Sequence, residues 1–102
     1  MAKRTIVWTL TASKQRREIL DYWNNRNKST LYSRKIISFT KERLNVVMNN
    51  PLIGKITDFP NTRIITLGHF SIFYQFNRKF IIIIGFWDNR QDPKKLLKLL
   101  KP

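Results

Sequence analysis

The sequence predicts an α+β fold in which a helical hairpin packs on a mostly antiparallel four-stranded sheet. Two segments in the first half of the chain, residues 12–25 and 31–49, carry apolar residues at helical spacing. The second half carries short segments rich in β-branched and aromatic residues, separated by turn residues. Helices in one half and strands in the other are typical of an α+β protein. The predicted order is β-α-α-β-β-β, followed by a short C-terminal helix.

A strand and a helix are expected first. Residues 4–9, RTIVWT, alternate weakly and are rich in residue types that favour strands. Thr11 is placed to cap the helix that follows, because a threonine hydroxyl can accept a hydrogen bond from the first helical turn. Within that helix, apolar residues recur at helical spacing, which predicts one apolar face (Ala12, Ile19, Tyr22 and Trp23).

The second helix is expected after a short polar turn at residues 24–28. Ser29 or Thr30 can cap this helix, and Asn50 before Pro51 ends it, since a residue that precedes proline disfavours the helical conformation. One stripe of the helix carries large apolar residues, namely Tyr32, Ile36, Phe39, Val46 and Val47. The short turn predicts that the two helices are antiparallel.

Turn residues delimit the last three predicted strands. Residues 52–60 contain a glycine and a proline and are expected to form a loop. Gly68 before His69 suits a type II′ hairpin turn, whose first position needs a positive φ. The strands are expected at residues 63–67, 70–76 and 80–87. The tail KKLLKLLKP is expected to form a basic helix whose leucine face covers the core edge or contacts a target (Leu96, Leu97, Leu99 and Leu100).

Length and composition limit the possible classes of protein. A chain of 102 residues is the size of one domain, so we expect a single domain over residues 1–102. The chain has no cysteine, which excludes disulfide bonds, thiolate metal ligands and cysteine nucleophiles. No apolar run approaches the roughly 18 residues of a membrane span, and the N-terminal stretch is a poor signal peptide. We therefore expect a cytoplasmic protein that does not contact a membrane.

The charge balance is the strongest bulk indication of function. Lys and Arg number 20 and Asp and Glu number 6, which gives a formal net charge of +14. Repulsion among so many like charges destabilises a compact chain, so a polyanionic partner is expected. Nucleic acid and an acidic protein both fit. The alternative is a basic domain whose charge serves solubility alone.

Motifs that carry catalytic chemistry are sparse. The sequence has no glycine-rich nucleotide loop and no zinc-ligand spacing, so we expect no metal and no cofactor. The lone His69 lies in a predicted turn and is interpreted as a solvated side chain, with a general base as the alternative. Asp88 could also act as a base, but the preferred interpretation is that it pairs with Arg90 or with the turn backbone.

Five residues are the candidates for a binding site: Lys55, Arg63, Trp87, Asp88 and Arg90. Lys55 lies in the predicted loop, Arg63 begins a strand, and Arg90 follows the last strand in the segment FIIIIGFWDNRQDP. Three converging cations would bind phosphate, or stabilise charge during phosphoryl transfer. Without convergence they are separate surface charges, and the sequence leaves both possibilities open.

Four motifs follow one another in a characteristic order: VWTLTAS, where a strand meets a helix; NNPLIGK, where a helix ends; TRIITLGHFSIFY, in the strands; and the closing WDNRQDP. With them the chain resembles, over nearly its whole length, the RelE/ParE superfamily of toxins from bacterial type II toxin–antitoxin systems. The resemblance implies an acidic antitoxin that wraps the toxin with an otherwise disordered segment. RelE-like members cut messenger RNA in the ribosomal A site, whereas ParE-like members poison DNA gyrase.

The resemblance also assigns individual residues. Arg63 matches the superfamily's second-strand arginine, and Arg90 matches the arginine of its closing motif. Two positions depart from the pattern, because Ser71 stands where many members carry an arginine and Asp88 stands where many carry a histidine. No tyrosine or histidine follows Trp87, so the resemblance implies a chain poorly equipped to cut RNA. The long helical hairpin resembles the ParE branch.

Three functions therefore remain open. The preferred one is a toxin that arrests growth as a non-catalytic inhibitor of DNA gyrase. The second is a ribosome-dependent endoribonuclease, with Asp88 or His69 as the base and three cations at the scissile phosphate, Lys55, Arg63 and Arg90. The third is a non-toxic basic module that binds nucleic acid or an acidic protein.

Overall fold

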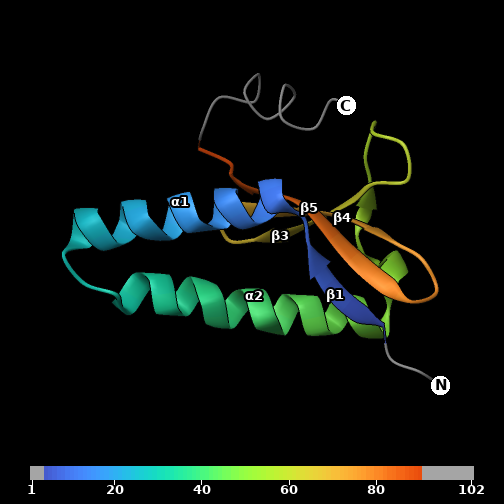
Figure 1. Cartoon of the computed structure of the whole chain (residues 1–102), viewed down its shortest axis with the longest axis horizontal. Helices are drawn as coiled ribbons and strands as arrows, with labels where there is room; N and C mark the ends of the chain where they lie inside the picture. Colours follow the sequence, from blue (N-terminus) through green and yellow to red (C-terminus); the bar gives the residue numbers. More distant parts are fainter. Residues whose placement is uncertain (1–3, 91–102) are drawn as a thin grey trace.

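The computed structural model describes residues 4–90 and has two layers, a helical hairpin and a five-stranded sheet (Figure 1). The predicted α+β class is confirmed, as is the packing of the hairpin on the sheet. The predicted C-terminal helix lies outside the described residues. In chain order the elements are β1 (Thr5–Trp8), α1 (Leu10–Asn27), α2 (Leu31–Asn49), the 3-10 helix η1 (Pro51–Ile53), β2 (Lys55–Ile56), β3 (Arg63–Leu67), β4 (Phe70–Phe76) and β5 (Phe80–Asp88).

The sheet has the strand order β1-β5-β4-β3-β2. Strands β2 to β5 pair antiparallel in sequence, whereas β1 pairs with β5 in parallel. A parallel pair needs a long crossover, which the helical hairpin and the intervening strands supply. Between β4 and β5 the register shifts after Phe73, and Ile84 has no Cα partner. Such a bulge increases the local twist of the sheet.

Helix α1 begins two residues earlier than predicted. Its N-cap is Thr9 rather than Thr11, and the Thr9 hydroxyl accepts a hydrogen bond from the Ala12 backbone N–H at 3.2 Å. The same hydroxyl donates to the carbonyl of Ile83 in β5 at 3.0 Å. This second bond explains the correction, because Thr9 both caps the helix and fastens its start to the sheet.

The segment predicted as a loop at residues 52–60 contains η1 and β2, and β2 is the fifth strand that the sequence did not predict. Tyr74 of β4 holds this segment in place. Its hydroxyl donates to the carbonyl of Pro51 at 2.7 Å and accepts from the N–H of Gly54 at 2.9 Å. Burial raises the pKa of Tyr74 above its ordinary value. Glycine is required opposite this ring, because a Cβ at position 54 would lie 2.5 Å from the tyrosine hydroxyl.

The core lies between the helices and one face of the sheet. Phe70, Ile72 and Tyr74 alternate along β4 and face this core, as strand geometry requires. The helices and β5 contribute further buried residues, namely Ala12, Ile19, Ile36, Leu44, Val47, Ile81, Ile83 and Phe86. This packing fixes the end of β5 against the middle of α1.

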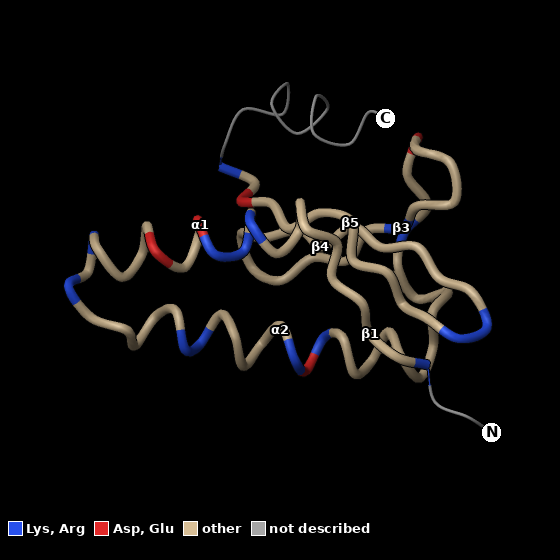
Figure 2. Tube along the Cα trace, in the orientation of Figure 1, with Lys and Arg blue, Asp and Glu red and all other residues tan. Residues whose placement is uncertain are grey.

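Basic side chains are spread over both helices and the β4–β5 turn (Figure 2). Some lie on aromatic rings, and the Arg16 guanidinium is 4.2 Å from the centre of the Trp8 ring.

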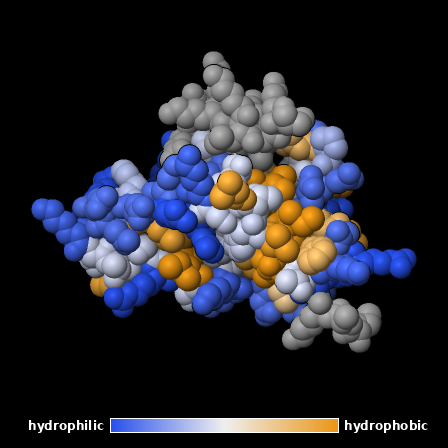
Figure 3. Space-filling model, viewed as in Figure 1, coloured by the Kyte–Doolittle hydropathy of each residue, from blue (hydrophilic) through white to orange (hydrophobic). Residues whose placement is uncertain are grey.

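Apolar side chains also reach the surface near β1 and β5 (Figure 3), where Val7 and Phe80 are partly exposed. Within residues 4–90, neither helix has the length and apolar character needed to cross a membrane.

Candidate functional site

Arg90, directly after β5, is held by the carboxylate two residues before it. The Arg90 Nε donates to Asp88 Oδ1 at 2.9 Å, and its Nη2 donates to Oδ2 at 2.7 Å. The Arg90 backbone N–H also donates to Oδ1, at 3.0 Å. The Asp88 side chain is only 9% exposed, whereas the Arg90 side chain is 42% exposed. The expected pairing is therefore confirmed, and it leaves part of the guanidinium accessible.

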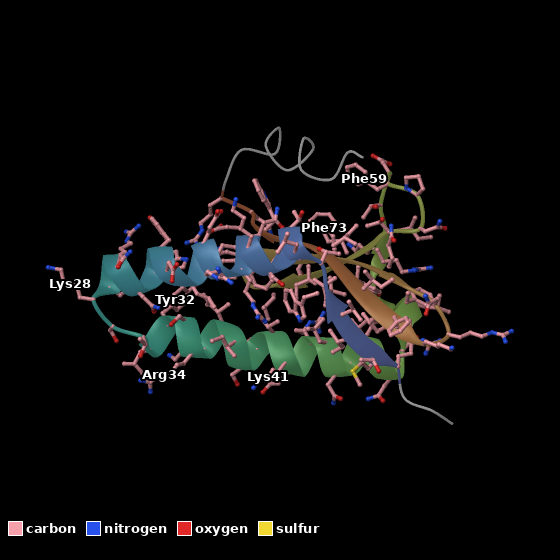
Figure 4. All side chains as sticks on the ribbon, viewed as in Figure 1. Lys28, Tyr32, Arg34, Lys41, Phe59 and Phe73 are labelled. Atoms are coloured by element: carbon pink, nitrogen blue, oxygen red, sulfur yellow. The ribbon has the colours of Figure 1, made fainter. Side chains whose placement is uncertain are left out.

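Two aromatic rings fix the other side of the guanidinium. Its central carbon lies 4.7 Å from the centre of the Trp23 ring in α1 and 5.8 Å from that of Phe70 in β4. Trp23 in turn meets Tyr32 edge to face, with ring centres 4.9 Å apart, and Figure 4 shows Tyr32 between the two helices. An arginine held by a carboxylate and two ring faces presents its charge in one fixed position.

The ion pair shifts the pKa values of both Asp88 and Arg90. Burial acts to raise the pKa of Asp88, but the hydrogen bonds and charge of Arg90, with a smaller effect of His69, hold it below its ordinary value. The pKa of Arg90 is raised, chiefly by its hydrogen bonds to Asp88. Asp88 is therefore ionised near neutral pH and already accepts three hydrogen bonds, so it is a weak proton acceptor.

A cavity of about 680 Å³ adjoins this ion pair. It is lined by α1 and by the end of β5, through Gln15, Glu18, Ile19, Tyr22, Trp23, Arg26, Phe86, Trp87, Asp88 and Arg90. Gln15 is buried and accepts from the N–H of Phe86 at 2.9 Å, yet its Nε2 has no partner among the described residues. The indole N–H of Trp23 likewise has none. The cavity thus has aromatic walls, and two buried donors beside it lack a partner among the described residues.

Arg63 lies at the other end of the sheet. It pairs with Tyr74, whereas Asp88 pairs with Phe70, four positions away along β4. Four positions on a strand correspond to about 13 Å. The Arg63 Nη1 donates to the carbonyls of Gly54 at 2.8 Å and Leu52 at 3.2 Å. The described contacts of this arginine fasten η1 to the sheet.

Lys55 does not join Arg63 either. In the register of β2 and β3, Lys55 pairs with Ile64 and Ile56 pairs with Arg63. Successive residues of a strand point to opposite faces, so Lys55 and Arg63 lie on opposite faces of the sheet. The structure therefore does not bring Lys55, Arg63 and Arg90 together around one phosphate.

Trp87 and Asp88 line the cavity as neighbours of Arg90, whereas Gln15, Trp23 and Phe70 were not predicted as part of a site. A signal for two of these three was available, because Gln15, Ile19 and Trp23 recur every four residues and share one helical face. The contact between this helical face and the end of β5 forms only in the tertiary fold, so helical periodicity alone does not indicate it.

Ser71 and His69 support the turn that follows β5. Ser71 is buried, and its hydroxyl donates to Asn89 Oδ1 at 2.7 Å. The backbone carbonyl of His69 accepts from the N–H of Asn89 at 2.7 Å. Ser71 stands where many members of the superfamily carry an arginine. In this chain its hydrogen bond to Asn89 holds the turn that precedes Arg90.

Comparisons with known proteins agree with this architecture. A family model described as the ParE toxin of the parDE type II toxin–antitoxin system matches residues 6–93. Among solved structures, a chain of the chromosomal ParDE toxin–antitoxin system from P. aeruginosa superposes with a TM-score of 0.70 at 19% sequence identity. That match covers 82% of this chain and 94% of the other, and at this identity it concerns the fold. No protein of curated function matched the sequence.

Proposed function

This chain belongs to the ParE toxin family of type II toxin–antitoxin systems, and we propose that it arrests bacterial growth by inhibiting DNA gyrase without cutting nucleic acid. Its proposed partner is an acidic antitoxin, because a formal net charge of +14 favours a protein of opposite charge. The proposed site is the partly exposed face of Arg90 together with Asp88, Trp87 and the adjoining cavity.

One observation carries the non-catalytic part of the proposal, the ion pair between Asp88 and Arg90. Acid–base cleavage of RNA needs a group that takes a proton from the attacking hydroxyl near neutral pH. Asp88 has a lowered pKa and three hydrogen bonds from Arg90, which make it a poor base. Lys55 and Arg63 lie away from Arg90 and give it no help in stabilising a phosphate. These features support a surface that binds its target without cleaving it.

The geometry of Arg90 also suits binding. A flexible arginine loses side-chain entropy when it is immobilised at an interface. Here Asp88, Trp23 and Phe70 already fix the guanidinium, although 42% of the side chain remains exposed. Binding to a partner therefore requires little further ordering of this side chain.

Induced expression in bacteria tests the proposal when two outcomes are measured in one culture, messenger RNA ends and trapped double-strand DNA breaks. The proposal predicts growth arrest with DNA breaks and without cleavage in the ribosomal A site. Arg90→Ala should weaken the arrest, whereas Arg78→Ala, at the exposed β4–β5 turn, removes the same charge and should not. A-site cleavage would instead make the chain a ribosome-dependent endoribonuclease. Healthy growth under strong induction would contradict both toxic functions.

A further inference from the structure

The connection between α1 and α2 forms an end of the helical hairpin that projects beyond the sheet (Figure 1). Residues 24–30 of this hairpin end, NNRNKST, are all polar, and each one from Asn25 to Thr30 is exposed. The sequence has no acidic residue between Asp21 and Glu42. The hairpin end therefore presents positive charge without a neighbouring carboxylate in the chain (Figure 2).

Three basic side chains supply the charge of the hairpin end. Arg26 lies in the last turn of α1, Lys28 is the C-cap of that helix, and Arg34 lies in the first turn of α2. All three are exposed, and Figure 4 shows Lys28 and Arg34 pointing away from the body of the protein. Within residues 4–90 the one ion pair is that of Arg90 with Asp88, so none of the three is paired with a carboxylate there. Such a surface attracts a polyanion.

The hairpin end is also held in a fixed shape. Ser33 of α2 is buried, and its hydroxyl donates to Asn24 Oδ1 of α1. The Arg26 Nη1 donates to the Tyr22 hydroxyl at 3.1 Å, and the central carbon of its guanidinium is 5.4 Å from the centre of the Trp23 ring. Because this arginine and the backbone around it are already ordered, binding a ligand costs less side-chain entropy.

We propose that the hairpin end binds the phosphate backbone of duplex DNA without reading its sequence. Arg26, Lys28 and Arg34 contact phosphate oxygens, and the amide and hydroxyl side chains of residues 24–30 add hydrogen bonds to phosphate and sugar. The inference rests on the proposed function only in the choice of DNA over RNA, since gyrase acts on DNA. It goes further by giving the toxin a direct contact with the nucleic acid.

The composition of the hairpin end favours a nucleic-acid backbone over a protein surface. Protein–protein interfaces are depleted in lysine and serine, whereas phosphate contacts come from arginine, lysine, asparagine, serine and threonine side chains. Residues 24–30 consist of these five residue types alone. Proteins that bind single strands stack the bases on aromatic side chains, and this stretch contains none. A duplex, whose phosphates lie on its outside, is therefore the better fit.

The test measures the anisotropy of a fluorescein-labelled DNA duplex of about 20 base pairs, titrated with the full chain at several salt concentrations. Lys28→Gly combined with Arg34→Ala removes two cations, and glycine suits the positive φ of 49° at Lys28. The slope of log Kobs against log salt should become shallower by about 1.8, because each phosphate contact contributes about 0.9. The Kd at about 0.1 M salt should rise at least about tenfold.

The matched control combines Arg78→Ala with Lys79→Ala in the exposed β4–β5 turn, at the opposite end of the molecule (Figure 1). It removes the same charge and should change the slope by less than about 0.5. A second variant, Arg26→Ala, removes one cation of the hairpin end and should make the slope shallower by about 0.9.

Equal slopes for the two double variants would overturn the assignment of the hairpin end. So would tighter binding of a single strand, or of an RNA duplex, of the same length. If the hairpin double variant keeps its affinity for DNA but no longer inhibits gyrase, the hairpin end binds the gyrase protein and the inference is wrong. The anisotropy assay contains no gyrase, so failure of the unaltered chain to inhibit supercoiling would contradict the proposed function alone.

Discussion

Replacing Asp88 with asparagine tests the ion pair that fixes Arg90. Asparagine keeps an oxygen in the Oδ1 position, which accepts from the Arg90 backbone N–H and Nε, but it removes the charge and the acceptor at Oδ2. A hydrogen bond to a charged group contributes about 1.5–3 kcal/mol. The Arg90 side chain is 42% exposed, so solvent replaces part of that interaction. We expect Asp88→Asn to lower the free energy of unfolding by about 1–2 kcal/mol.

Urea denaturation at pH 7, followed by tryptophan fluorescence, measures this loss. The matched control is Asp58→Asn, which removes the same charge from an exposed residue and should change stability by less than about 0.5 kcal/mol. Equal stability of Asp88→Asn and the unaltered chain would refute the reasoning. It would mean that Asp88 does not hold the guanidinium in place.

The stability that the Asp88 carboxylate contributes should depend on pH. The pKa of Asp88 in the folded chain is lower than its ordinary value, which is about 3.9 in an unfolded chain. The carboxylate therefore contributes its full stability above the unfolded pKa and loses it as the pH falls through the folded pKa. The stability difference between Asp88→Asn and the unaltered chain should be constant from pH 5 to 7 and should shrink below about pH 4.

Three further predictions concern the segment that joins α2 to β3, and all are measured by urea denaturation. Tyr74→Phe should cost about 2–3 kcal/mol, because it leaves two buried backbone groups without a partner, and a loss below about 0.5 kcal/mol would contradict this. Gly54→Ala should cost about 1–3 kcal/mol, because its Cβ would meet the Tyr74 hydroxyl; unchanged stability would contradict the close approach. Arg63→Met should cost about 1–2 kcal/mol through two lost hydrogen bonds while toxicity persists at permissive temperature. Full stability with lost toxicity would instead assign Arg63 to target binding.

Local signals were sufficient for most of the secondary structure. Helix α2 and strands β3 and β4 have the predicted bounds, because Pro51 ends the helix and Gly68 with His69 closes the hairpin. Gly68 has a φ of 59°, as the predicted turn requires of its first position. Each of these boundaries depends on residues that are close together in the sequence.

Contacts between distant residues account for what was missed. Thr9 and Thr11 are chemically equal as caps, and the choice between them follows from the bond of Thr9 to Ile83. Strand β2 and helix η1 depend on Tyr74 and Arg63, which reach them from β4 and β3. No pattern within a short stretch of sequence indicates contacts between residues that are so far apart in the chain.

The candidate site divides in the same way. The pairing of Asp88 with Arg90 is local and was predicted from a spacing of two residues. The separation of Lys55, Arg63 and Arg90 depends on strand register, which the sequence left open. The contribution of Gln15 and Trp23 depends on how α1 packs against β5, which helical periodicity does not reveal.

Inhibition of DNA supercoiling by purified gyrase is the most direct test of the central claim. The unaltered chain should inhibit supercoiling in a concentration-dependent manner, and Arg90→Ala should need a several-fold higher concentration while Arg78→Ala matches the unaltered chain. When ribosomes programmed with messenger RNA are incubated with the same preparation, the messenger RNA should remain uncut. Normal supercoiling together with cleavage of the messenger RNA would contradict the account.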